Sequence, residues 1–192
     1  MEFKDKKFED QAFNKIICPG QDLQDREFSK CVFKKCDFGD CNFSGSLFMD
    51  CVFEGCNLSN IKINNCGFQG VSLEGCKIIG VDFSVLKTLL IDWSFSACII
   101  ELCSFGHLKM RGTKFFECAI RNTDFIRTNL VESDFSGSDL KGSKFQSTIL
   151  EKADFSRARN YYIDPTQNKV KLAKFSYPEV LILLDPFGVV LD

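Results

Sequence analysis

Cysteine is the residue type in this sequence whose number and spacing could do chemistry. Residues 31–43 read CVFKKCDFGDCNF, with three cysteines five residues apart, and the 192-residue chain holds eleven cysteines in all. Cysteines at this density commonly build a zinc site, a disulfide framework or a redox centre. The choice among these depends on the elements that position the thiols.

A period of five residues runs through most of the chain. From Phe3 to Phe83 every fifth residue is apolar, and after a slip of two residues the period resumes at Leu90 and continues to Phe155. These positions, the core series, take up 18 of the 21 phenylalanines. A second series of mostly small residues, the small series, lies two residues before the core positions and holds ten of the eleven cysteines, with Ser, Thr, Ala or Val at many other positions. The cysteines are therefore part of the repeat.

A period of five matches neither the 3.6-residue period of a helix nor the two-residue alternation of a strand. Two inward-facing residues, two apart, followed by a polar pair rich in glycine predict a short extended segment and then a tight corner. Units of this kind wind into a solenoid whose coils stack like neighbouring strands, about 4.8 Å apart.

Units such as CDFGD, CNFSG, TNLVE, SDFSG and ADFSR resemble those of the pentapeptide repeat family, whose consensus is A(D/N)Lxx. The resemblance covers residues 3–157 and implies an all-β fold, a right-handed quadrilateral β-helix with four units per coil and roughly eight coils. We therefore predict a solenoid over residues 1–157, with a register break at 84–93. Residues 158–192 are predicted to form a C-terminal cap that includes a short helix.

The same resemblance bears on the cysteines. With four units per coil, Cys31, Cys36 and Cys41 lie on different walls, and residues 20 apart stack. We expect three columns of stacked thiols: Cys36 with Cys56 and Cys76, Cys31 with Cys51, and Cys98 with Cys118. Parallel side chains in a column do not point at one another as a disulfide requires, and the C-x₄-C spacing is not that of a zinc site. The cysteines, including Cys18 in the core series, are predicted to be buried, reduced and free of metal, and no cofactor is expected.

Two segments depart from the repeat. The stretch SVLKTLLIDW (84–93) favours a two-residue bulge that the core absorbs, or alternatively a kink or recognition bump. Near the C-terminus, Ser176 as N-cap, Pro178 and Glu179 predict a helix that Pro186 stops, followed by a closing strand over 187–191. This tail either only seals the last coil or also forms a homodimer contact. The candidate dimer residues are Val180, Leu181, Leu184, Phe187, Val189, Val190 and Leu191.

Composition and motifs argue against several classes of protein. The net charge is −2, so no basic face for direct nucleic-acid binding is implied. The start MEFKDKKFED is not a signal peptide and no apolar run is long enough for a membrane span, so we expect a cytoplasmic protein. His107, the one histidine, falls at an outward corner, and no P-loop, GxGxxG or HExxH motif occurs. We expect no enzymatic activity.

The resemblance extends to topoisomerase-protecting members of the family, the Qnr, MfpA and McbG types, in the mid-chain break and the apolar tail. It implies a DNA mimic that binds DNA gyrase or topoisomerase IV, confers quinolone resistance and forms a homodimer through its C-terminus. Glu117, Asp134 and Asp154 share one predicted wall and are the candidate acidic partner face. The near-neutral charge leaves open a scaffold with an unknown protein partner. Its binding wall would use exposed apolar residues, for which the candidates are Val32, Leu47, Met49, Val52, Phe116 and Ile126.

Overall fold

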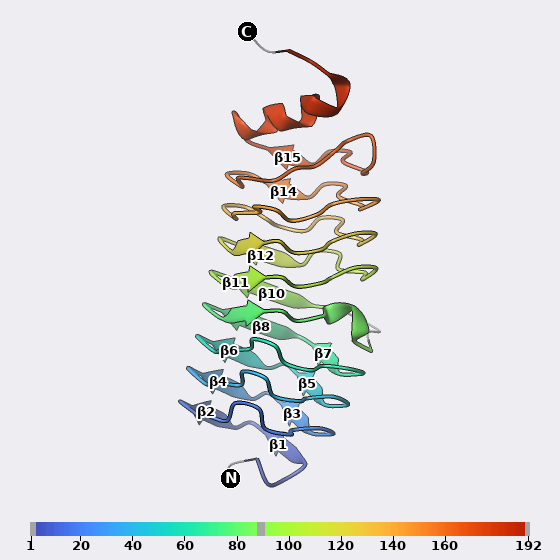
Figure 1. Ribbon diagram of the computed structural model, residues 1–192. Coiled ribbons are helices and arrows are strands. Elements are labelled where there is room, and N and C mark those ends of the chain that lie inside the picture. The colour runs from blue at the N-terminus through green and yellow to red at the C-terminus, as the bar shows by residue number, and fades with distance from the viewer. Residues whose placement is uncertain (1–2, 88–90, 191–192) are drawn as a thin grey trace.

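The protein is a parallel β-solenoid of about eight coils. The computed structural model describes residues 3–87 and 91–190. Figure 1 shows the coils stacked into a rod, with the N-terminus at one end and a short helix at the other. Each coil has four walls, which we number 1 to 4 in the order in which the chain passes them.

Three walls contain strands. Wall 1 is a sheet of β1 (Lys7–Glu9), β3 (Glu27–Ser29), β5 (Leu47–Met49) and β7 (Gly67–Gln69). Wall 2 is a sheet of β2 (Ala12–Asn14), β4 (Val32–Lys34), β6 (Val52–Glu54), β8 (Val71–Glu74), β10 (Trp93–Ser96) and β12 (Lys114–Phe116), and near the C-terminus it continues with β14 (Asp154–Phe155) and β15 (Lys174–Phe175). Wall 3 is a sheet of β9 (Lys77–Ile79), β11 (Ile99–Glu101) and β13 (Ala119–Arg121). Wall 4 is held by single parallel bridges, such as those that join Asp82, Ser104, Asp124 and Lys144.

The Asp or Asn between the two series fixes the turn that follows it. The Asn42 side chain accepts the backbone N–H of Ser44 at 3.1 Å, and Asp134 accepts that of Ser136 at 2.8 Å. The next corner residue then adopts the left-handed conformation, as at Gly45 with φ 74°. This local bond explains why the repeat carries Asp or Asn at this position.

The two inward-facing series form the core. Every core-series residue that the structure describes is buried, and so is every described small-series residue from Cys31 to Ala153, whereas the first small-series positions, from Lys6 to Arg26, are exposed or half-buried. Leu90 lies outside the described residues. Phenylalanines one coil apart stack in parallel, as Phe115 does on Phe135 with ring centroids 4.9 Å apart. Phenylalanine rings from neighbouring walls pack edge to face, as those of Phe115 and Phe125 do with an interplanar angle of 84°. Both arrangements are favourable for aromatic rings, so one ring size serves every coil.

The mid-chain slip is taken up within a single coil. Strand partners are 20 residues apart below it, 22 apart across it, as for Val71 and Trp93, and 20 apart again for Phe95 and Phe115. A 3₁₀ turn, η1 (Phe83–Val85), begins the longer coil. The Trp93 indole is buried in the small series and donates its N–H to the Phe68 carbonyl at 3.1 Å. An apolar cavity of about 20 Å³ lies beside Trp93, so the longer coil still packs closely.

The backbone completes one coil beyond the end of the sequence repeat. β14 pairs with β15, and the Phe175 ring stacks on Phe155 at 5.2 Å. In this coil Asn168 replaces the Ser or Thr of the small series, and its side chain donates to the Phe145 carbonyl at 3.0 Å. The predicted boundary at residue 157 marks the loss of the repeat in sequence, whereas the solenoid continues to Phe175.

A nine-residue 3₁₀ helix, η2 (Glu179–Phe187), covers the last coil. The predicted N-cap at Ser176 was wrong, because its hydroxyl accepts the N–H of Arg157 at 2.9 Å and Pro178 occupies the cap position. The predicted stop at Pro186 was also wrong. A proline in the last turn costs only one hydrogen bond, and the left-handed Gly188 (φ 65°) ends the helix.

The predicted closing strand over 187–191 is absent from its described residues, 187–190, where the helix ends and the chain continues without a strand. Among the residues that the structure describes, no helix is long and apolar enough to cross a bilayer.

Candidate interaction surfaces

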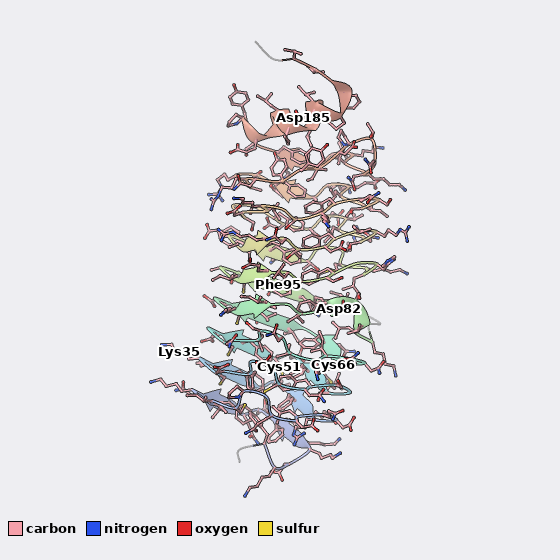
Figure 2. All side chains as sticks on the ribbon, viewed as in Figure 1. Lys35, Cys51, Cys66, Asp82, Phe95 and Asp185 are labelled. Carbon is pink, nitrogen blue, oxygen red and sulfur yellow. The ribbon has the colours of Figure 1, made fainter. Side chains whose placement is uncertain are left out.

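The thiols line the interior and donate hydrogen bonds to the coil below. Cys51 Sγ lies 3.4 Å from the Phe28 carbonyl oxygen, and the Thr128 hydroxyl makes the equivalent bond to Phe105 at 3.0 Å. All eleven cysteines are free and buried, which confirms the predicted burial. Figure 2 shows Cys51 and Cys66 within the stack of coils. The hydrogen bonds that the thiols donate were not predicted from the sequence. The presence of Ser and Thr at equivalent positions of the small series was the signal for this role.

Five cysteines form one continuous column. The 22-residue coil places Ile99 beside Lys77, so Cys98 follows Cys76 in the same column. The prediction of a separate column for Cys98 and Cys118 was wrong. It assumed that stacked residues are always 20 apart, whereas across the break they are 22 apart. The column consists of Cys36, Cys56, Cys76, Cys98 and Cys118.

Most of the buried thiols are poor nucleophiles and poor metal ligands at neutral pH, because their pKa is raised; the exceptions are Cys41 and Cys118, whose pKa is lowered by hydrogen bonds with Cys18 and Cys98. Burial raises the pKa of the Cys51 thiol to about 11 and that of Cys66 to about 12. Redox and metal chemistry both use the thiolate, which such groups form only in strongly alkaline solution. In residues 3–87 and 91–190 no three His, Cys, Asp or Glu side chains are placed to hold a metal ion. The thiols act here as structural donors.

The ionisable side chains that could serve catalysis are either solvated or held in a closed network. His107 is exposed at a corner with φ 65°. Asp139 is buried on wall 3, where it accepts hydrogen bonds from Asn160 at 2.7 Å and Arg121 at 3.2 Å. Burial raises the pKa of Asp139, but these bonds outweigh it and the pKa is lowered overall. A carboxylate held in this way is a weak base and an anchor for wall 3.

The predicted acidic face is a wall of mixed charge. Asp134 and Asp154 do lie in adjacent coils of wall 2, but the next residues of the same ladder are Lys114 in the coil below and Lys174 in the coil above. Lys174 forms a salt bridge with Asp154 at 3.1 Å. Asp134 and Asp154 also cap the backbone N–H groups two residues on, as the repeat requires. Glu117 is exposed at the neighbouring corner, so the three acids share one region without forming an acidic stripe.

An apolar surface lies at the C-terminal end of the rod. Ile182 and Leu183 pack against the core, while Val180, Leu181 and Leu184 remain half-buried. The exposed apolar side chains at this end are those of Leu172, Tyr177, Phe187, Val189 and Val190. This C-terminal surface includes six of the seven candidate dimer residues, and Leu191 lies outside the described residues.

A second group of exposed apolar residues, the mid-rod patch, lies along wall 3 and its two corners, with Lys77, Glu101 and Arg121 among them. Ile99, Leu102 and Phe116 are exposed, and Ala97 and Ile79 lie beside them in the register of the strands. Of the apolar wall residues proposed from sequence, Phe116 is exposed as predicted. The other five are half-buried: Val32, Leu47, Met49, Val52 and Ile126. Ile99 and Leu102 were missed, because the period of five fixes which residues face outward but not how far each projects.

Comparisons with known proteins agree with this architecture. Residues 26–89 and 87–155 match the family model described as "Pentapeptide repeat region". One trypsin-treated variant of QnrB1, a plasmid-mediated fluoroquinolone resistance protein, superposes with a TM-score of 0.74 at 16% identity, over 97% of each chain. A second trypsin-treated QnrB1 variant gives a TM-score of 0.69 at 14% identity, over 94% of this chain and 100% of that chain.

HetL, a pentapeptide repeat protein involved in heterocyst differentiation regulation in the cyanobacterium Nostoc sp. strain PCC 7120, gives a TM-score of 0.50 at 14% identity, over 88% of this chain and 87% of that chain. Comparison with curated proteins finds no match. At these identities the likeness shows a shared fold.

Proposed function

The chain belongs to the pentapeptide repeat family, and from this premise we propose that it is a non-enzymatic binding protein whose partner is a type II topoisomerase, DNA gyrase or topoisomerase IV. Binding would protect the enzyme from quinolones. The observation that carries the proposal is the likeness to the QnrB1 rod over 97% of both chains. The role belongs to the cytoplasm, and it needs no direct contact between this protein and nucleic acid.

The surface charge sets the strength of this interaction. A topoisomerase groove that holds DNA recognises dense phosphate charge, whereas the two acids of wall 2 lie between Lys114 and Lys174. The proposed DNA mimicry is therefore local, at Asp134, Asp154 and Glu117. We expect modest affinity that weakens as salt is added, because exposed charges are screened.

We also propose that two copies join through the C-terminal surface. Val189 and Val190 are 48% and 86% exposed, which is costly for valine on a monomer. A dimer would double the length of the rod. Light scattering on the wild-type protein should give the mass of two chains. Val190→Asp should give the mass of one with its melting temperature unchanged, because Val190 does not touch the core. A monomeric wild type would refute the dimer.

A supercoiling assay tests topoisomerase binding. Purified protein at micromolar concentration should inhibit gyrase, or restore its activity in the presence of a quinolone. Asp134→Asn with Asp154→Asn should abolish the effect without unfolding the rod, because asparagine makes the same turn at Asn42 and Asn129. Asp124→Asn on wall 4 is the matched control and should retain it.

If the wild type neither inhibits nor protects gyrase or topoisomerase IV, a protein-interaction scaffold takes the place of this proposal. The mid-rod patch is the observation that favours that alternative. The likeness to HetL is consistent with it, since HetL is described as involved in a regulatory process.

A further inference from the structure

Cys18 is placed differently from the other thiols. It is the one cysteine in the core series, while the other ten lie in the small series. The core residues above it on wall 3 are Phe38, Leu58 and Ile78, which fill far more of the interior than a thiol does. The significance of a cysteine at this position lies in what its thiol contacts.

The Cys18 thiol meets that of Cys41, which belongs to the small series of wall 4 in the next coil. Cys41 Sγ donates to the Cys18 carbonyl oxygen at 2.9 Å, and the Cys18 thiol is in turn placed to hydrogen-bond with the Cys41 sulfur. The two side chains point inward from different walls, so they converge at the corner between these walls. A disulfide requires side chains that converge in this way.

A second pair of thiols lacks this convergence. Cys98 and Cys118 also share a hydrogen bond, which lowers the pKa of Cys118 as the bond from Cys18 lowers that of Cys41. They are stacked one coil apart on wall 3, however, where β11 and β13 pair in register. Stacked side chains run parallel instead of toward each other. The second pair therefore matches the first in its lowered thiol pKa but not in the direction of its side chains.

A pocket in the first coil, at the blue end of the rod in Figure 1, lies beside the pair. It has a volume of about 360 Å³, and its lining includes the exposed side chains of Lys15 and Ile17, the buried Cys18 and the half-buried Gln21. Gln21 lies one coil below Cys41 in the small series of wall 4. The pocket is therefore close enough for a small oxidant to reach both thiols by local opening of the first coil.

The hydrogen bond between the thiols fixes the order of their reaction. It lowers the pKa of Cys41, whereas the same bond and burial raise the pKa of Cys18, so Cys41 forms the thiolate and Cys18 keeps its proton. The Cys41 thiolate attacks one oxygen of hydrogen peroxide and the O–O bond breaks. The products are a sulfenic acid on Cys41 and a hydroxide, which takes up the proton that Cys41 released.

The second step joins the two sulfurs. The Cys18 sulfur bonds to the Cys41 sulfur, and the sulfenic hydroxyl leaves as water with the Cys18 proton. The two sulfurs have then lost two electrons, and the peroxide has been reduced to two molecules of water.

We propose that Cys18 and Cys41 form a modification site for hydroperoxides, at which oxidation joins the first coil to the second by a disulfide. Both thiols are free in the structure, which is the reduced state of the site. The disulfide closes a loop whose ends are 23 residues apart and holds the two coils together. The proposal is independent of the topoisomerase, because both thiols lie inside the rod.

Peptide mapping after oxidation tests the site. The protein is exposed to stepwise hydrogen peroxide, the remaining thiols are alkylated in denaturant, and chymotryptic peptides are analysed by mass spectrometry without reduction. Cleavage after phenylalanine and leucine places Cys18 in peptide 14–23 and Cys41 in peptide 39–43, each without another cysteine. These two peptides should be the first to be joined, with a mass two hydrogens below their sum. They should join at a peroxide concentration at least about tenfold below that which couples Cys98 to Cys118.

Two serine variants locate the reaction. Cys41→Ser removes the attacking sulfur and keeps a donor in a series that accepts serine, as Ser46 shows with its 3.0 Å bond to the Leu23 carbonyl. Cys18 in this variant should remain a free thiol at the peroxide concentration that links the wild type. Cys98→Ser is the matched control, because it makes the same replacement in the other pair, and it should form the disulfide as the wild type does. Melting temperatures check that both variants fold.

The wild-type measurement is decisive without any variant. The inference is overturned if peptides 14–23 and 39–43 stay unlinked at a peroxide concentration that oxidises the thiols of the urea-unfolded chain. It is also overturned if Cys98 and Cys118 couple as readily. Neither outcome involves gyrase, so the proposed function is tested separately.

Discussion

The lower coils (residues 3–83) and the upper coils (residues 95–155) share one backbone and differ in the small series. In the lower coils this series holds seven cysteines: Cys31, Cys36, Cys41, Cys51, Cys56, Cys66 and Cys76. In the upper coils threonine and serine predominate: Thr113, Thr123, Thr128, Ser133, Ser138, Ser143 and Thr148. Both kinds of side chain reach the carbonyl oxygen 23 residues back. Cys56 lies 3.3 Å from that of Phe33, and Ser143 lies 3.0 Å from that of Ile120.

This comparison indicates that the backbone hydrogen bonds between coils set the coil spacing. Either a thiol or a hydroxyl can then serve as the side-chain donor at that spacing. Sulfur is larger, makes longer hydrogen bonds and is a weaker donor than a hydroxyl. A thiol also loses its proton in a pH range that experiments can reach, whereas a Ser or Thr hydroxyl does not. Carboxylates with a lowered pKa, among them Asp139 and Asp154, lie in the upper part of the rod. The two regions should therefore respond to opposite extremes of pH.

Alkaline pH should produce the largest effect, in the lower coils. Burial raises the pKa of Cys36 and Cys51 to about 11 and that of Cys66 to about 12, from 9.0. The unfolded chain therefore loses these protons first, so the stability they contribute is complete below pH 9 and is lost as the pH rises toward 11–12. Each thiol costs about 2 kcal/mol at about pH 11, and several together approach the whole stability of a typical domain.

Circular dichroism from about pH 8 to 12 measures this loss, and subtilisin cleavage mapped by mass spectrometry locates it. The first cuts should fall in the lower coils. Replacing Cys36, Cys51 and Cys66 by serine should move the transition to higher pH. First cuts in the upper coils would show that the thiols do not control it.

Removal of one core ring should have the next largest effect and should be greater in the upper coils. The Phe135 ring stacks on Phe115 and Phe155 at 4.9 and 5.0 Å. Phe43 meets its two aromatic neighbours, Phe38 and Phe48, only edge to face and lines the mid-rod cavity. Phe135→Ala should cost about 4–5 kcal/mol and Phe43→Ala about 3 kcal/mol. Urea unfolding measures both, and an unchanged midpoint for either would show that its ring is not buried.

Removal of a single donor should have a smaller effect and should distinguish oxygen from sulfur. Thr128→Val keeps the side-chain shape and leaves the Phe105 carbonyl without its 3.0 Å partner, at a cost of about 1–2 kcal/mol. Cys51→Val should cost less than about 1 kcal/mol, because the thiol is a weak donor and Val71 already occupies the next position of that column. Equal costs in urea unfolding would contradict the assignment of the hydroxyl as the stronger donor.

Much of this fold follows from the sequence, because a period of five leaves few choices. The alternation at Phe43 or Phe135 fixes which residues face inward, and the Asp or Asn between them fixes the turn. The cap could not be derived in the same way. Once the repeat ends, Ser176 can cap a helix or accept the N–H of Arg157, and only the position of the preceding coil decides between them. The exposure of Ile99 and Leu102 likewise depends on neighbours in other coils.

Acid should act on the upper coils, with the smallest of these effects. Burial raises the pKa of Asp139, but the bonds from Asn160 and Arg121 outweigh it and hold the pKa below its usual value of 3.8. The stability it contributes is therefore present above pH 3.8 and is lost as the pH falls through the lowered value. Asp139→Asn keeps an acceptor for Asn160 but loses the charge that faces Arg121, at a cost of about 1 kcal/mol at neutral pH.

Below pH 3.8 the wild type loses the same charge, so the difference between the two proteins should shrink toward zero in urea unfolding carried from neutral to strongly acidic pH. Cys51→Val is the control from the lower coils, and its difference from wild type should stay constant over this range, because a neutral thiol does not titrate in acid. A constant difference for Asp139→Asn as well would mean that its carboxylate carries no pH-dependent stability. The contrast between the two regions would then rest on the thiols alone.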